Sequence, residues 1–257
     1  MKIQIASDIH LEFPQNRKWL SENPLIPQAN LLILAGDTVP YVYANWAKDF
    51  YADISSKFDQ VFSIFGNHEF YRGEINSAYP DYQENIAENI IQLNNKSILY
   101  QDIRFIFSTL WTDVPLEFRP KVQELMNDYR LIKKRTLFKE LVNIQVEDMV
   151  NYYQQSLDFL INEIEKYQNQ KTVVVTHHVP VYESLPARFM ESALKYSYGN
   201  DLSELIINNP QICLWIYGHC HSFDQRKIGE TTLIRNPLGY VSKKQQQDFD
   251  REKILEI

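Results

Sequence analysis

Cysteine and glycine are scarce in this chain of 257 residues, and long apolar runs are missing. The two cysteines, Cys213 and Cys220, argue against a disulfide framework and favour a reduced, cytoplasmic setting. The apolar runs are of strand length, well short of the roughly 20 residues of a transmembrane helix, so we expect no membrane association. Strand-like residues 2–6 follow Met1 directly, and we therefore expect no signal peptide.

An excess of positive charge is absent as well. The net charge is −7 at pH 7, so we expect no general binding of nucleic acids or anionic membranes. Hydrophobic residues make up 44% of the chain and aromatic residues 13%, which is enough for a large core. The sequence contains no convincing linker, internal repeat or low-complexity tract. We expect one domain over residues 1–257.

Strand-like and helix-like patterns alternate along the chain, which predicts an α/β fold. Strands are expected at residues 2–7, 31–35, 60–65, 97–100, 103–110, 171–176, 212–217, 223–228 and 231–235. Apolar residues at helical spacing predict helices over residues 41–58 and 145–168. The same spacing at Tyr82, Ile86, Ile90 and Leu93 predicts a further helix.

All six histidines fall in four short motifs, and each motif follows a strand-like run. The motifs are Ser7-Asp8-Ile9-His10, Gly66-Asn67-His68-Glu69, the doublet His177-His178 and Gly218-His219-Cys220-His221. A fifth strand-like run, residues 31–35, ends in Gly36-Asp37. Histidine is the most common metal ligand and the usual proton-transfer group near neutral pH. Because no histidine occurs elsewhere, we infer that these residues serve chemistry.

The positions of these motifs predict a shared metal site. Ligands of open α/β sheets bind beyond the carboxyl ends of the strands, where all five motifs stand. In an extended segment, residues two apart face the same side, so Asp8 and His10 can share one ion, as can His219 and His221. The mixture of oxygen and imidazole donors suits Mn, Fe, Zn, Co or Ni better than calcium.

The ordered set of Asp-x-His, Gly-Asp, Gly-Asn-His-Glu, a strand-ending His and Gly-His-x-His resembles the calcineurin-like metallophosphoesterases over residues 8–221. Further stretches at residues 110–113, 128–130 and 236–240 resemble a bacterial, uncharacterised branch of that superfamily. The resemblance implies a four-layer αββα sandwich, in which two mixed β-sheets are flanked by helices. It also implies a dinuclear metal site at the C-terminal ends of the strands.

The resemblance also implies a role for each motif. The implied metal ligands are Asp8, His10 and His221 for one ion, Asn67, His177 and His219 for the other, and Asp37 as the bridge between them. His68 is then a catalytic group over the substrate, as a proton donor or phosphate contact. Glu69 is expected to form hydrogen bonds near the ligands rather than to bind metal. Two divalent ions, with manganese favoured, would activate water for attack on a phosphate ester.

Three further assignments stay open at this stage. The strand end selects His177 as the ligand, which we prefer, whereas a His-x-Pro spacing before Pro180 selects His178. In the preferred alignment His178 lies near the substrate. Arg130 either contacts a substrate phosphate or forms a surface salt bridge. The aromatic-rich residues 181–200 either form a lid over the substrate or pack on the sheet.

Departures from the family pattern narrow the range of expected substrates. Residues 36–41 read Gly-Asp-Thr-Val-Pro-Tyr and residues 66–71 read Gly-Asn-His-Glu-Phe-Tyr, so both arginines of the protein phosphatases are missing. Retention of His10 is shared with phosphodiesterase branches. We predict a phosphohydrolase for a small phosphodiester or nucleotide, with a phosphodiesterase favoured over a monoesterase. The alternatives are a phosphate- or nucleotide-binding module that keeps the metals but catalyses weakly, and a metal-dependent amidohydrolase.

Overall fold

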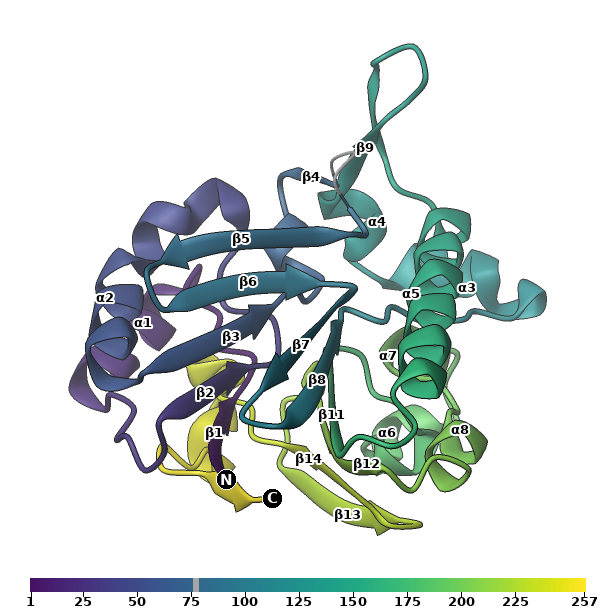
Figure 1. The fold of residues 1–257 in the computed structure, drawn as a ribbon. Coiled ribbons are helices and arrows are strands. Elements are labelled where there is room, and N and C mark those ends of the chain that lie inside the picture. The colour runs from purple at the N-terminus through teal and green to yellow at the C-terminus, as the bar shows by residue number, and fades with distance from the viewer. Residues whose placement is uncertain (76–78) are drawn as a thin grey trace.

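The computed structural model describes residues 1–75 and 79–257, in which two six-stranded sheets pack together (Figure 1). The first sheet has the order β15 (Ile254–Glu256), β1 (Lys2–Ala6), β2 (Leu31–Leu34), β3 (Gln60–Ile64), β6 (Ile90–Asn94) and β5 (Tyr82–Ala87). The second has the order β13 (Asp224–Ile228), β14 (Thr231–Arg235), β12 (Ile212–Ile216), β11 (Thr172–Thr176), β8 (Ile103–Ser108) and β7 (Lys96–Tyr100). In each sheet the inner strands are parallel and both edge strands are antiparallel to their neighbours. Both sheets are therefore mixed.

Helices cover the outer face of each sheet (Figure 1). The helices α1 (Pro14–Glu22) and α2 (Lys48–Lys57) lie over the first sheet, and α5 (Val146–Lys166) lies over the second. The short helices are α3 (Arg119–Leu125), α4 (Asp128–Leu131), α6 (Ala187–Met190), α7 (Lys195–Tyr198) and α8 (Ser203–Ile207). The 3₁₀ helices are η1 (Tyr41–Ala47), η2 (His68–Phe70), η3 (Leu116–Phe118), η4 (Tyr182–Ser184), η5 (Val241–Lys243) and η6 (Gln245–Asp248).

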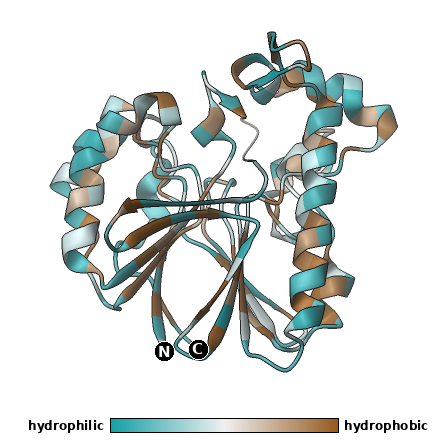
Figure 2. Ribbon diagram, turned by 45° about the horizontal axis from the view of Figure 1, so that its top comes forward, coloured by the Kyte–Doolittle hydropathy of each residue, from teal (hydrophilic) through white to brown (hydrophobic). Residues whose placement is uncertain are grey.

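The alternation of side chains along each strand explains why the molecule has four layers. Ile33 of β2 and Val175 of β11 belong to one apolar cluster between the two sheets. The neighbouring Leu32 points the other way and packs in the cluster that contains Ile54 of α2. Val174 likewise belongs to the cluster beneath α5. Apolar residues accordingly lie along the inner strands in Figure 2. The predicted αββα sandwich is confirmed.

The expected strands are all present, and the helical patterns over residues 41–58 and 145–168 correspond to η1 with α2 and to α5. The helix predicted through Tyr82, Ile86, Ile90 and Leu93 is wrong. These residues form the hairpin β5–β6, and Asn89 in its turn is held by the end of α2. The Asn89 amide donates to the carbonyl oxygens of Ser55 and Phe58 at 2.9 and 2.6 Å. These contacts are distant in sequence, so a periodic pattern does not predict them.

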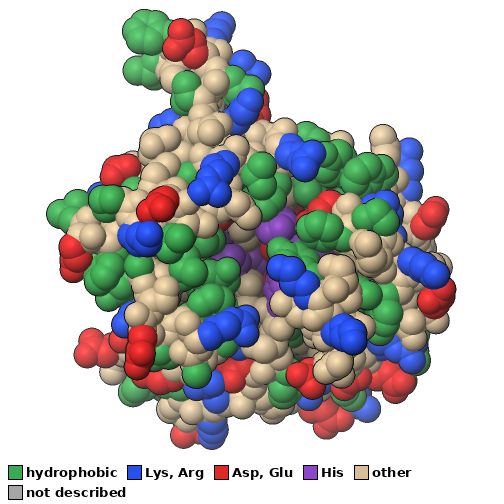
Figure 3. Space-filling model, turned by 180° about the vertical axis from the view of Figure 1, so that it is seen from behind, with side chains coloured by type: hydrophobic (Ala, Val, Ile, Leu, Met, Phe, Trp, Pro, Cys, Tyr) green, Lys and Arg blue, Asp and Glu red, His purple; other side chains and the backbone are tan. Residues whose placement is uncertain are grey.

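A small third sheet lies beside these layers, in the order β10 (Leu141–Asn143), β9 (Lys133–Arg135) and β4 (Glu74–Ile75). Its β9–β10 hairpin projects from the body of the molecule, as Figures 1 and 3 show. Among the residues that the structure describes, no helix is long and apolar enough to span a lipid bilayer.

Candidate metal centre

The carboxyl ends of β1, β2, β3, β11 and β12 meet at one place, and the predicted ligands follow these ends. The structure brings six of them together, namely Asp8, His10, Asp37, His177, His219 and His221, and Asn67 lines the same cavity as Asp37 and His219. All but His221 are buried. The site forms the floor of a cavity of about 840 Å³, and histidine side chains are visible at the bottom of this hollow in Figure 3.

One group of ligand atoms comes from Asp8, His10 and His221. Nε2 of His10 lies 3.0 Å from Nε2 of His221, and Oδ1 of Asp8 lies 3.4 Å from the same His221 nitrogen. The Nδ1 atom of each ring has an acceptor, which is Glu12 for His10 and Oε1 of Gln245 for His221. Each Nδ1 therefore donates a hydrogen bond, and the two Nε2 atoms face each other. A cation held by both nitrogens would stabilise that arrangement.

A second group comes from Asp37, His177 and His219. Nε2 of His177 lies 3.2 Å from Nδ1 of His219 and 3.4 Å from Oδ1 of Asp37. The other nitrogen of His177 donates to the carbonyl oxygen of Ala35 at 2.9 Å, which orients the ring so that Nε2 faces the group. This is the arrangement of an imidazole that binds metal through Nε2.

Asp37 lies between the two groups, because Oδ1 faces His177 and Oδ2 lies 3.7 Å from Nε2 of His10. Asn67 adds an oxygen acceptor, its side-chain Oδ1. Its Nδ2 donates to Asp128 at 2.7 Å, whereas its buried Oδ1 has no hydrogen-bond partner within the described part of the chain. Buried acceptors without a partner are rare, and a bound cation would satisfy this one. The residues present therefore fit a divalent metal site with mixed oxygen and imidazole donors.

The backbone is strained where it carries these side chains. Four candidate ligands have left-handed φ angles between 51° and 68°, namely Asp8, His10, Asp37 and His219. Glycine is needed beside them, since a Cβ at Gly36 would lie 2.5 Å from Nδ1 of His177 and one at Gly66 would overlap the Asp37 carboxylate. Strain of this kind concentrates at functional sites because surrounding contacts hold it in place.

Glu12 also belongs to the site, although it is not among the residues predicted from the sequence. Its Oε1 lies 2.7 Å from Nδ1 of His68 and 3.1 Å from Nδ1 of His10. Burial alone would raise the pKa of Glu12, but the two histidines lower it to about 2, so the group is a carboxylate. Glu12 continues the every-second-residue pattern of Asp8 and His10, and that pattern was the signal for it.

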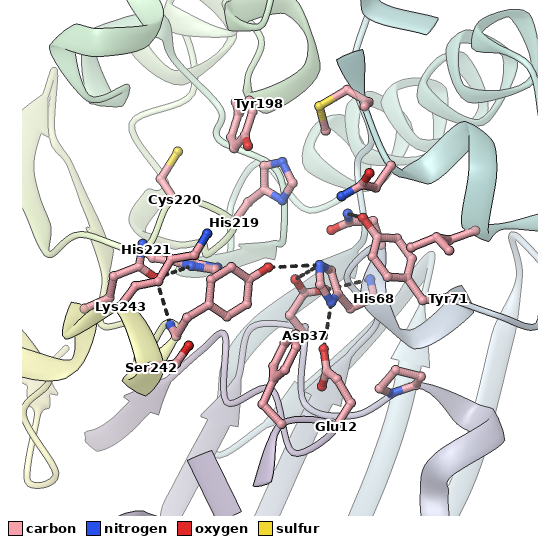
Figure 4. Close-up of a pocket in the computed structure, with 18 of the residues that line it drawn as sticks. Glu12, Asp37, His68, Tyr71, Tyr198, His219, Cys220, His221, Ser242 and Lys243 are labelled. Atoms are coloured by element: carbon pink, nitrogen blue, oxygen red, sulfur yellow. Dashed lines mark hydrogen bonds and ion pairs between the residues drawn. The ribbon is translucent and has the colours of Figure 1, made fainter. Parts of the chain in front are cut away.

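His68 lies above the candidate ligands, with its ring stacked on Tyr71 at 4.0 Å (Figure 4). Its backbone N–H donates to Oδ1 of Asp37 at 2.9 Å, and its Nε2 lies 3.4 Å from the hydroxyl of Tyr240. Burial lowers the pKa of His68, but the carboxylates of Asp37 and Glu12 outweigh burial and raise it to about 9. His68, Glu12 and His10 also form a cluster of possible ligands, but the Glu12 bonds already satisfy its imidazoles without an ion.

The other residues singled out in the sequence occupy different surroundings. His178 is buried outside both ligand groups, donates from Nδ1 to the carbonyl oxygen of Thr109, and packs its ring 4.4 Å from that of His219. Burial and the neighbouring His177 lower the pKa of His178 to about 3. Arg130 is exposed, donates to the carbonyl oxygen of Glu124, and is not among the described residues that line the cavity.

Glu69 holds the loops that carry the candidate ligands. Its carboxylate accepts backbone N–H bonds from Asp37, Thr38 and Gly66 at 3.0, 2.6 and 2.7 Å. It thereby ties the loop after β2 to the loop after β3. This geometry agrees with the expectation that Glu69 forms hydrogen bonds near the ligands.

Two segments form much of the cavity wall. Within residues 181–200, Arg188, Phe189, Leu194 and Tyr198 line the cavity. The second segment was not singled out as part of the site, and it contributes Tyr240, Ser242, Lys243 and Gln245. The rings of Tyr240 and His221 lie edge to face at 4.4 Å, which closes the cavity beside the first ligand group.

Comparisons with known proteins agree with this geometry. Residues 1–223 match the family described as calcineurin-like phosphoesterase. An uncharacterised protein of Acanthamoeba polyphaga mimivirus is 29% identical over 263 residues, which cover 93% of this chain and 91% of that protein.

A solved structure from Mycobacterium tuberculosis has the same fold at low sequence identity. The phosphopantetheinyl hydrolase of Mycobacterium tuberculosis is 15% identical, with a TM-score of 0.67 over 96% of this chain and 92% of that one. The anchor protein GAP50 of the Plasmodium inner membrane complex is 14% identical, with a TM-score of 0.47 over 93% and 71% of the two chains.

Proposed function

The chain belongs to the calcineurin-like phosphoesterase family, and on that basis we propose that it hydrolyses a small phosphodiester or phosphomonoester at a dinuclear metal centre. The observation that carries this proposal is the pair of ligand groups with the Asp37 carboxylate between them. The proposed ligands are Asp8, His10 and His221 for one ion, Asn67, His177 and His219 for the other, and Asp37 for both. The preferences for manganese and for phosphodiesters, and the cytoplasmic setting, stay predictions from the sequence.

Metal ions held by these residues would supply positive charge to a bound phosphate and lower the pKa of water near neutrality. The protein contributes the fixed arrangement of donors. Hydrogen bonds orient His10, His177 and His221 from behind, so that each presents its Nε2 to the site. Such preorganisation means that little rearrangement is needed when the ions and the phosphate bind.

His68 is the proposed proton donor to the leaving oxygen. Its Nδ1 is engaged by Glu12, so in the protonated ring the second proton is on Nε2, on the side of Asp37 and Tyr240. The raised pKa of about 9 keeps this ring protonated at neutral pH. Metal ions bound beside Asp37 would weaken the effect of the Asp37 carboxylate on the pKa of His68. The hydrogen bond to Glu12 would then be the contact that keeps the proton on His68.

The cavity favours a substrate larger than a bare phosphate. Its volume of about 840 Å³ is within the range of roughly 300–1,000 Å³ that is usual for small-molecule sites. Much of the wall is aromatic or aliphatic, with contributions from Phe13, Tyr43, Trp46, Tyr71, Met126, Phe189, Tyr198 and Tyr240. We propose an organic phosphate ester of about nucleotide size.

Hydrolysis of bis-p-nitrophenyl phosphate and of p-nitrophenyl phosphate, each with added manganese and after chelation, tests this proposal. We expect metal-dependent release of p-nitrophenolate, faster from the diester. Asp37→Asn protein purified in parallel controls for contaminating phosphatases. Binding of two ions without hydrolysis of either ester would contradict the hydrolase assignment and support a binding module.

A further inference from the structure

Three cationic side chains stand at the mouth of the cavity, and none of them pairs with a carboxylate within residues 1–75 and 79–257. Arg72, Arg188 and Lys243 line the cavity and are exposed. The ion pairs formed by the described residues include none of the three. The two carboxylates that line the cavity, Glu12 and Asp37, already face histidines. The mouth therefore carries surplus positive charge in a chain whose net charge is −7.

Arg188 stands on the side of the second ligand group. Its guanidinium carbon lies 4.7 Å from the ring centroid of Phe189, which stacks on Tyr198 at 4.2 Å. The Tyr198 ring lies 4.6 Å from the ring of His219. Two packed aromatic rings thus connect this cation to a proposed metal ligand, which fixes its place on the cavity wall.

Lys243 stands on the side of the first ligand group. Its Nζ lies 5.3 Å from the ring centroid of Tyr240, and that ring lies 4.7 Å from His10 and 4.4 Å from His221. Figure 4 shows the Lys243 side chain beside His221 at the edge of the site. The two cations therefore flank the metal centre from opposite ligand groups, each separated from it by aromatic rings.

From this arrangement we propose that Arg188 and Lys243 form a second anion subsite, and that the substrate carries a second phosphate group besides the ester that is hydrolysed. The inference rests on the proposed function and narrows its substrate class to bisphosphorylated or diphosphate metabolites. The ester phosphate meets the metal centre on the floor. A second phosphate at the mouth would meet arginine and lysine, which bind phosphate oxygens through charge-assisted hydrogen bonds.

A matched pair of chromogenic diesters tests the subsite. Thymidine 5′-(p-nitrophenyl phosphate) and its 3′-phosphorylated derivative share the scissile bond and the leaving group and differ by one phosphate. For the wild-type protein with manganese, we expect kcat/KM to be about tenfold higher for the 3′-phosphorylated diester, mainly through KM, because the extra contact is remote from the reacting bond. The advantage should shrink as salt is added, since exposed charges are screened.

Substitutions test whether the higher kcat/KM for the 3′-phosphorylated diester depends on Arg188 and Lys243. Arg188→Gln and Lys243→Gln should each reduce the ratio of kcat/KM between the two diesters by several fold, and together they should bring it close to one. Lys244→Asn is the matched control, because Lys244 is exposed, does not line the cavity and has a left-handed φ of 59° that asparagine tolerates. This control should keep the wild-type ratio.

Competitive inhibition by adenosine 5′-monophosphate, 5′-diphosphate and 3′,5′-bisphosphate tests other separations between the first and the second phosphate. At least one of the two bisphosphorylated compounds should inhibit more strongly than the monophosphate, and the difference should vanish in the double variant. Hydrolysis of both diesters with equal kcat/KM and equal inhibition by all three nucleotides would overturn the subsite while leaving the proposed function intact. Failure of the metal-loaded protein to hydrolyse the two diesters, bis-p-nitrophenyl phosphate and p-nitrophenyl phosphate would overturn both.

Discussion

Oε1 of Glu12 lies 2.7 Å from Nδ1 of His68, and the same oxygen lies 3.1 Å from Nδ1 of His10. One buried carboxylate thus orients the proposed proton donor and one of the proposed metal ligands together. Nε2 of His10 then faces Nε2 of His221, and Nε2 of His68 faces the hydroxyl of Tyr240. Glu12 therefore acts as a positioning residue for the proposed proton donor and for one proposed metal ligand.

Replacing Glu12 by glutamine tests this role. Glu12→Gln keeps the size of the side chain but removes the charge that favours a protonated His68 and strengthens His10 as a ligand. We expect about a 10- to 100-fold lower kcat in the presence of saturating manganese, and weaker binding of one ion. Steady-state kinetics and metal titration measure the two effects. Glu22→Gln, at an exposed position of α1, should change neither, and wild-type behaviour of Glu12→Gln would contradict the role.

His68→Ala separates metal binding from catalysis. His68 is not a proposed ligand, so the variant should keep both ions while kcat falls by roughly 10²–10⁴, the range for a positioned general acid. The loss should be larger for an alkyl ester than for a p-nitrophenyl ester, because p-nitrophenolate departs without a proton. Both esters must be assayed on the same metal-loaded protein. Full activity on both would return His68 to a structural role.

Asp37→Asn tests the bridge. The substitution preserves the shape of the side chain but removes a negative charge that lies between the two ligand groups. We expect weaker binding of both ions, and not of one alone, in calorimetric titrations with manganese. Loss of a single ion, with the other bound as in the wild type, would show that Asp37 serves one site only.

The doublet offers a matched pair of variants. His177 has its Nε2 within 3.4 Å of Asp37, whereas His178 is outside both ligand groups. His177→Ala should therefore reduce the bound metal from about two ions to one, and His178→Ala should retain two in folded protein. Elemental analysis after gel filtration gives the answer. Metal loss in His178→Ala alone would reverse the assignment.

Metal binding should strengthen as the pH rises. Burial lowers the pKa of His177, but the Asp37 carboxylate outweighs it and raises the pKa to about 9 in the metal-free protein. Below that pH an ion must displace the proton, so affinity should fall by about tenfold per pH unit for this ligand. Burial lowers the pKa of His10 and His219, which bind without losing a proton near pH 7. Titrations at pH 6, 7 and 8 measure the slope, and an affinity independent of pH would contradict it.

The sequence patterns predict those elements whose formation depends on residues close together in the chain. The strands and α5 follow from apolar periodicity, and the motifs at strand ends meet because parallel strands bring their carboxyl ends together. The hairpin β5–β6 has the apolar spacing of a helix, but its turn at Asn89 is anchored by Ser55 and Phe58, far away in sequence. Periodicity carries no information about such contacts.

The supporting residues of the site were harder to predict for the same reason. Gln245 orients His221 from a segment that follows no strand-end motif, and Tyr240 packs on the same ring. Asp128 was noted only as part of a family-like stretch, yet its bond to Asn67 turns the amide oxygen of Asn67 away from protein donors. These roles depend on geometry between distant segments, which the order of residues does not show.

Anomalous diffraction from a manganese-loaded crystal would show whether two ions share Asp37. We expect two anomalous peaks on the cavity floor, one bounded by Asp8, His10 and His221 and the other by Asn67, His177 and His219. The Asp37 carboxylate should contact both peaks. A single peak, or two peaks of which one has no contact with Asp37, would show that Asp37 does not bridge two ions.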